Sequence, residues 1–86
     1  MKLLFCGNCG DIFNLRLREK QCGCGQTKGR YINERDAQYS GESAVTLGLV
    51  NREFGQAVRI QPASGDGPRF TSFVIAKDCN SFVKVR

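Results

Sequence analysis

Four of the five cysteines in this chain lie near its amino terminus, in two pairs. The pairs stand in Cys-Gly-Asn-Cys-Gly and Cys-Gly-Cys-Gly, and twelve residues separate them, so the pattern C-x2-C-x12-C-x-C consists of Cys6, Cys9, Cys22 and Cys24. A glycine follows each pair and permits a positive φ, which turns backbone N–H groups toward sulfur. Two such turns, held by a β-hairpin, place four thiolates tetrahedrally around Zn²⁺ at roughly 2.3 Å. The pattern therefore predicts one structural zinc ion per chain.

The same cysteines allow three other interpretations. Iron in a rubredoxin-like site needs four thiolates as well, but rubredoxins have C-x2-C in both turns. A redox C-x2-C would need a βαβ context and would leave the second pair without a role. Two disulfides would need an oxidising compartment, which nothing in the sequence indicates.

The amino-terminal third resembles the zinc ribbons, small modules that carry two cysteine knuckles on adjacent hairpin turns. The resemblance covers roughly residues 4–33 and implies that the four paired cysteines are the metal ligands. The second knuckle departs from the usual C-x2-C, because its C-x-C spacing makes a tighter turn. The remaining residues resemble those of small bacterial or phage proteins with an amino-terminal ribbon.

The chain lacks the groups of the commonest catalytic sites. It contains no histidine, which excludes Ser-His-Asp and Cys-His catalysis and any zinc site with imidazole ligands. A four-thiolate zinc site has no open position for water or substrate, so we expect no metal catalysis and no small-molecule substrate. The fifth cysteine, Cys79, follows Lys77 and Asp78 and is a conceivable nucleophile. We expect instead a half-buried thiol near a strand end, and a protein that is not an enzyme.

The charge distribution offers one candidate nucleic-acid surface. The formal net charge is +5, of which residues 1–35 carry +4, and a zinc ion with four thiolates lowers the total to +3. Five basic residues at alternate positions would form a single patch able to contact phosphates if their strands pair. They are Arg16, Arg18, Lys20, Lys28 and Arg30. A net charge of +3 attracts nucleic-acid phosphates only weakly. We therefore expect a non-enzymatic adaptor or regulatory module that binds a protein, with nucleic-acid binding as the alternative.

Hydrophobic periodicity predicts a small α+β protein. Alternation over 11–21 indicates a strand with Phe13, Leu15 and Leu17 on its buried face, and 30–33 is a second extended run. Residues 44–50 read as a strand, Asn51 as the N-cap of a short helix, and 63–68 as a loop. Further strands are expected over 70–76 and 82–85. The helix stripe of Phe54, Ala57 and Val58 is expected in the core.

These elements predict an organisation in two parts. A zinc ribbon over 1–33 precedes a compact, β-rich segment over 34–86 that packs on it, with both forming one structural unit. No stretch approaches the roughly 20 apolar residues that cross a membrane, and residues 1–5 are too short for a signal peptide. We therefore expect a cytoplasmic protein without membrane contact.

Overall fold

The computed structural model describes residues 1–85, in which β-strands predominate and one helix occurs. The first five strands are β1 (Lys2–Cys6), β2 (Ile12–Asn14), β3 (Lys20–Gln21), β4 (Lys28–Tyr31) and β5 (Ala37–Ser40). They are followed by β6 (Ala44–Leu49), α1 (Asn51–Arg59), β7 (Ser72–Val74) and β8 (Phe82–Lys84). The mainly β architecture with one short helix agrees with the expected α+β class.

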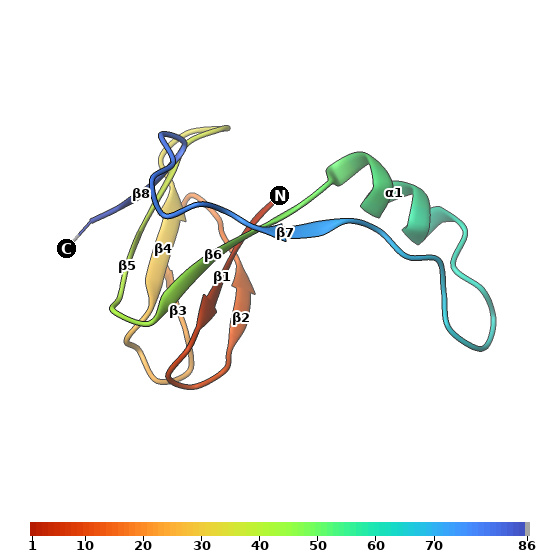
Figure 1. The fold of residues 1–86 in the computed structure, drawn as a ribbon, viewed down its shortest axis with the longest axis horizontal. Coiled ribbons are helices and arrows are strands. Elements are labelled where there is room, and N and C mark those ends of the chain that lie inside the picture. Colours follow the sequence, from red (N-terminus) through yellow and green to blue (C-terminus); the bar gives the residue numbers. More distant parts are fainter. Residues whose placement is uncertain (86) are drawn as a thin grey trace.

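The strands form two four-stranded sheets (Figure 1). The first sheet has the order β2-β1-β6-β7 and is antiparallel throughout. The second has the order β3-β4-β5-β8, in which β8 pairs with β5 in parallel and the other neighbours are antiparallel. Each sheet thus combines strands from 1–33 with strands from 34–86.

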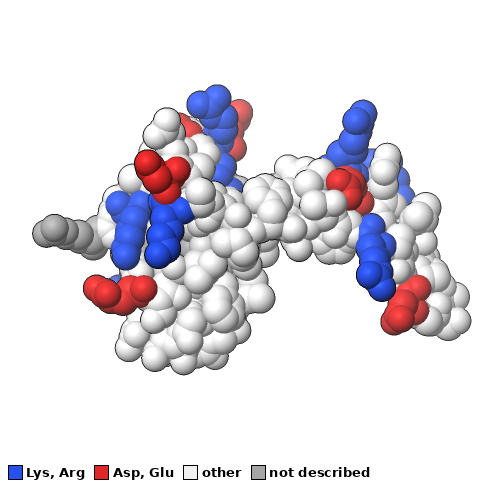
Figure 2. Space-filling model, viewed as in Figure 1, with Lys and Arg blue, Asp and Glu red and all other residues white. Residues whose placement is uncertain are grey.

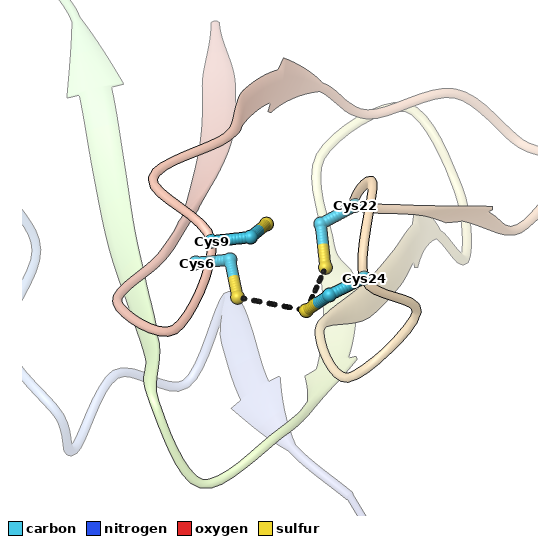
Figure 3. Close-up of side chains that lie close together, drawn as sticks. All are labelled: Cys6, Cys9, Cys22 and Cys24. Carbon is cyan, nitrogen blue, oxygen red and sulfur yellow. Dashed lines mark hydrogen bonds between the residues drawn. The ribbon is translucent and has the colours of Figure 1, made fainter.

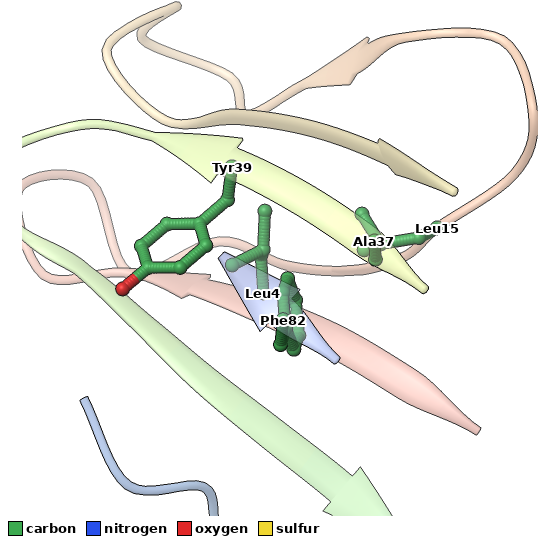
Figure 4. Close-up of a cluster of buried hydrophobic side chains, with 5 residues drawn as sticks. All are labelled: Leu4, Leu15, Ala37, Tyr39 and Phe82. Atoms are coloured by element: carbon green, nitrogen blue, oxygen red, sulfur yellow. The ribbon is translucent and has the colours of Figure 1, made fainter. Parts of the chain in front are cut away.

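The inner faces of the two sheets meet at a small apolar core (Figure 4). Its buried members are Leu4, Leu15, Ala37, Tyr39 and Phe82. The rings of Tyr39 and Phe82 meet edge to face with centroids 5.3 Å apart. Gly29 on β4 is required there, because a Cβ at that position would lie 2.5 Å from Leu4 Cδ1.

The single strand predicted over 11–21 is wrong. The chain forms β2 and β3, separated by 15–19, and these two strands belong to different sheets. Leu15 is buried at the crossing between the sheets, whereas Leu17 is 65% exposed. The apolar alternation continues beyond the point where the chain leaves the first sheet, so Leu17 does not share the buried face.

Several other elements lie where the sequence places them. Strand β6 covers six of the seven residues predicted over 44–50, and β8 lies within 82–85. Strand β7 is confined to 72–74 within the longer prediction over 70–76, and β4 overlaps the run over 30–33. Residues 63–68 contain no strand or helix. Strands β1 and β5 were not predicted.

Helix α1 and the loop over 60–71 project from the body of the molecule and form the arm (Figure 1). The expectation that the helix stripe lies in the core is wrong, since no residue of α1 is buried and Val58 is 56% exposed. The apolar side of α1 instead meets the loop, where Phe54 and Phe70 pack edge to face with centroids 5.0 Å apart.

The start of α1 also differs from the prediction. Val50 is the N-cap and makes no side-chain capping bond, and Asn51 is the first helical residue. The side-chain oxygen of Asn51 accepts a hydrogen bond from the amino group of Met1, so it does not cap the helix. Within residues 1–85, no helix has the length and apolar character needed to cross a membrane.

Candidate metal centre

Each cysteine pair lies on the turn of one β-hairpin. Cys6 is the last residue of β1, and the turn that contains Cys9 leads into β2 of the first sheet. Cys22 follows β3, and the turn that contains Cys24 leads into β4 of the second sheet. The two pairs therefore come from different sheets, and a metal held by both would tie the sheets together.

The four sulfurs converge on one point between the two turns (Figure 3). All lie within 4.8 Å of one another, with 3.7 Å between the sulfurs of Cys6 and Cys24 and 3.5 Å between those of Cys22 and Cys24. A regular tetrahedron with metal–sulfur bonds of about 2.3 Å has sulfur–sulfur edges of about 3.8 Å. The separations of 3.5 and 3.7 Å are close to that edge length and exceed the roughly 2.05 Å of a disulfide bond.

The two turns share one backbone plan despite their different cysteine spacing. The N–H of Cys6 donates to the carbonyl of Asp11, and the N–H of Cys22 donates to the carbonyl of Thr27, so each turn closes between a cysteine and the fifth residue after it. Gly10 and Gly25 both have φ of 79°, as the sequence predicts for the residue after each pair. The C-x-C knuckle thus moves its second ligand and its glycine one residue earlier within a hairpin turn of unchanged length.

Backbone and side-chain donors surround the sulfurs. The N–H of Thr27 donates to Cys22 Sγ at 3.3 Å, and the side-chain amide of Asn8 donates to Cys24 Sγ at 3.4 Å. The carboxylate of Asp11, from the first turn, accepts a hydrogen bond of 3.0 Å from the N–H of Gly23 in the second. These bonds fix the two turns relative to each other, and N–H donors stabilise sulfur as thiolate.

Thr27 is fully buried beside the cluster, and its hydroxyl has no hydrogen-bond partner of ordinary geometry. The thiol of Cys6 lies within reach of that hydroxyl, which is the largest cause of a lowered pKa at Cys6. A buried hydroxyl without a partner is costly. A thiolate at Cys6, such as a metal-bound one, would accept its proton and remove that cost.

Two thiols of the cluster have pKa values shifted in opposite directions. Burial raises the pKa of Cys22, but the N–H of Thr27 and the thiols of Cys24 and Cys6 outweigh it and lower the pKa to about 6. At Cys9 the N–H of Asp11 lowers the pKa, yet burial and the same two neighbouring thiols together raise it. The lowered pKa of Cys22 therefore favours a thiolate there at neutral pH before any metal binds.

The four sulfur donors suit a soft metal ion. Four thiolates select zinc, cuprous or iron ions over magnesium and calcium, which prefer oxygen ligands. Cys6 and Cys22 are buried, whereas Cys9 and Cys24 are exposed, so one side of the cluster faces solvent and offers a path for the ion. The four cysteines predicted as ligands thus form one cluster that could hold a metal.

The five basic residues of the predicted patch do not share one face. Lys20 pairs with Gly29, so its side chain lies on the inner side of the second sheet. There it donates to the side-chain oxygen of Asn14 on β2 at 2.9 Å. Lys28 and Arg30 alternate with Gly29 on β4 and therefore lie on the opposite, outer face.

Arg16 and Arg18 lie outside both sheets. They are exposed in the crossing segment 15–19, where the carbonyl of Arg16 accepts a hydrogen bond from the N–H of Tyr31. On the face shown in Figure 2, acidic side chains lie among the Lys and Arg side chains of the body. The single basic patch expected from the sequence is therefore divided between different surfaces.

Cys79 lies apart from the cysteine cluster, as a half-buried thiol three residues before β8. Its neighbour Ser81 lowers its pKa through its hydroxyl and N–H, against burial, and the Ser81 hydroxyl lies 3.4 Å from its sulfur. This position agrees with the expected half-buried thiol near a strand end.

Asp11 and Thr27 are site residues that the sequence analysis missed. Both occupy the fifth position after the first cysteine of a pair, so a common offset marks them in the sequence. Comparison of the chain with protein-family models, with curated proteins and with solved structures finds no match.

Proposed function

We propose that this chain is a zinc-stabilised module that binds protein and catalyses no reaction. The cysteine cluster supports the zinc part, because its donors are all sulfur and its sulfur–sulfur distances suit Zn²⁺. Four thiolates fill the coordination sphere of zinc and leave no position for a substrate, so the role of the ion is to stabilise the fold.

The single observation that carries the protein-binding part is an apolar, uncharged sheet surface. Strand register places seven apolar side chains on the side of the first sheet that faces away from the second. We call this surface the outer face; its residues are Leu3, Phe5, Ile12, Val45, Leu47, Leu49 and Val74. Ile12 and Val74 are 55% and 69% exposed. Monomeric proteins rarely leave such a contiguous patch uncovered.

The outer face continues toward the arm. Phe70, at the base of the arm, lines a surface hollow of about 500 Å³ together with Leu3, Leu47 and Leu49. Figure 2 shows an uncharged surface over β1, β2 and β6 that extends along β7. A partner that buries this surface would remove apolar area from water at little cost in desolvated charge.

The test is affinity capture with the zinc-loaded chain as bait, followed by mass spectrometry. Val74 lies on the outer face, whereas Val83 is an exposed valine on β8 in the second sheet. We expect Val74→Asp to lose the captured protein and Val83→Asp to keep it. Equal capture by both variants would contradict a role for the outer face.

Nucleic-acid binding is the second candidate, and one observation favours it. Lys28 and Arg30 lie side by side on the outer side of β4, and the Arg30 Nε atom is buried without a hydrogen-bond partner. The two neighbouring cationic side chains could contact phosphate oxygens together. A salt titration of binding to unspecific DNA or RNA decides the question: affinity that falls steeply with salt and is weakened by Arg30→Ala supports this candidate. No binding at low salt eliminates it.

A further inference from the structure

We propose that the protein bound by the outer face is a second copy of this chain, in a two-fold symmetric dimer with the two outer faces packed together. This inference rests on the protein-binding function proposed above and names the partner. Its structural basis is the composition, charge and area of the outer face.

The composition of the outer face is that of a face buried between two sheets. Except for one phenylalanine, its members are all leucine, isoleucine and valine. Sheets pack face to face at about 10 Å when such side chains interdigitate. A second copy supplies a matching apolar sheet face, and a two-fold axis makes each contact occur twice.

Charge makes a second copy a suitable occupant. The zinc-loaded chain carries a net +3, so two copies repel each other over most contact geometries. The register places only apolar residues, Asn14 and Ser72 on the outer side of the first sheet, and none of these carries an ionisable side chain. One ammonium group, that of Lys20, reaches the β2 edge of this face, where it donates to the side-chain oxygen of Asn14. Away from that edge, contact between outer faces brings no like charges into direct opposition, and it needs no charged groups from a partner.

The exposed area suits a weak dimer. A large apolar side chain offers on the order of 150–200 Å² when fully exposed. Ile12 and Val74 are 55% and 69% exposed, the neighbouring Phe70 is 39% exposed, and the other members of the outer face are half-buried. Together they offer roughly 400–600 Å² per copy, at the low end for specific complexes. We therefore expect a dimer that dissociates at micromolar concentrations.

The small size of the internal core favours assembly of two copies. Its hydrophobic cluster has five buried members, whereas Ile12 and Val74 of the outer face remain exposed. Covering the outer face would add a second apolar layer to a domain whose own core is thin.

Sedimentation-velocity centrifugation of the purified, zinc-loaded chain over a concentration series tests the proposal. We expect mass to rise from 9.5 kDa toward twice that value as concentration increases through the micromolar range. Val74→Asp should abolish the increase, because two carboxylates would be buried together, while Val83→Asp should retain it. Ile12→Asp and Ile32→Asp form a second matched pair, since Ile32 is 47% exposed but lies outside the first sheet.

Each outcome decides the proposal, with zinc content and circular dichroism confirming that every variant is folded. A wild-type chain that stays monomeric at about 0.5 mM overturns it, as does a dimer that survives both outer-face substitutions. If the chain is monomeric but captures a different protein that Val74→Asp loses, the dimer is wrong and the protein-binding function stands. If neither dimerisation nor capture depends on the outer face, both the proposed dimer and the proposed protein-binding function are wrong.

Discussion

Asp11 and Thr27 occupy the same position in the two cysteine turns but act differently on the cluster. Asp11 joins the turns through its bond to the N–H of Gly23, whereas Thr27 directs donors at sulfur from its N–H and from its buried hydroxyl. Residues of this kind tune metal affinity although they do not touch the ion. Their contribution can be separated from that of the ligands by substitutions that preserve shape.

Thr27→Val should weaken zinc binding by about 10-fold, within the usual range for outer-shell partners. The valine removes the hydroxyl that lowers the pKa of Cys6 and keeps the volume of the buried side chain. In the metal-free chain the same change removes a buried hydroxyl without a partner, so unfolding by denaturant should show no loss of stability. Competition with a chelator of known affinity measures the zinc effect.

Thr27→Ser is the matched control because it keeps the hydroxyl. Its zinc affinity should stay closer to that of the wild type than the affinity of Thr27→Val. If valine and serine weaken binding equally, the hydroxyl has no role and the effect comes from packing.

Zinc binding should release no more than three protons at pH 7.5. Cys22 has a pKa of about 6 in the folded chain, lowered from 9.0, so it is already a thiolate at this pH, and at most three of the four ligands still carry protons. As the pH falls through 6, Cys22 gains a proton and the number released should rise toward four. Calorimetry in buffers of different ionisation enthalpy counts these protons; four released at pH 7.5 would contradict the lowered pKa.

The clustering of the four cysteines was predictable from the sequence, since it depends on cysteine spacing and on flexible turns. The roles of Asp11 and Thr27 were not, because they depend on which residues close each hairpin. The basic residues show the same limit: alternate spacing predicts a common face, but pairing of Lys20 with Gly29 turns Lys20 inward and leaves Lys28 outward.

At the scale of elements, hydrophobic alternation located strands but did not give their ends. Residues 11–21 alternate throughout, yet the chain divides there between two sheets, because β2 and β3 take different neighbours. Strand β1 has apolar side chains on both faces, with Leu4 in the core and Leu3 on the outer face. Such a strand has no alternation to detect. Helix α1 was predictable from its apolar stripe, but amphipathicity does not specify what covers the stripe.

Gly29→Ala should destabilise the fold by about 1–3 kcal/mol, as overpacking of a close-packed core does. Its Cβ would lie 2.5 Å from Leu4 Cδ1 and 3.2 Å from Leu15 Cδ2, where the two sheets meet. Gly67→Ala on the arm is the control, since its nearest neighbour would lie at an ordinary 3.4 Å. Denaturant unfolding of the zinc-loaded variants measures both, and equal stability would contradict the close approach of the sheets at Gly29.

For the whole molecule, the cysteine cluster lies where the two sheets come together at one end. One pair belongs to the β1–β2 hairpin and the other to the β3–β4 hairpin. A bound metal would therefore cross-link the sheets in addition to the packing of the five-residue core and the hydrogen bond between Asp11 and Gly23. The contribution of zinc in small zinc peptides is about 10–16 kcal/mol, comparable to the entire stability of a typical domain, about 5–15 kcal/mol.

Removing one of the four clustered cysteines should therefore lower the stability of the protein strongly. We expect Cys24→Ser to lose zinc and to melt at a much lower temperature than the wild type, as measured by circular dichroism. Cys79→Ser removes a half-buried thiol away from the cluster and should keep both. A Cys24→Ser variant that melts like the wild type would mean that the fold does not depend on the metal.

Native mass spectrometry of the chain purified without chelator tests the central claim most directly, because it reports bound metal and thiol oxidation state together. The account predicts one zinc ion per chain, with all five cysteines reduced. A purified chain that carries no metal and binds none when zinc is added, or one whose paired cysteines have lost hydrogens to disulfides, would contradict it.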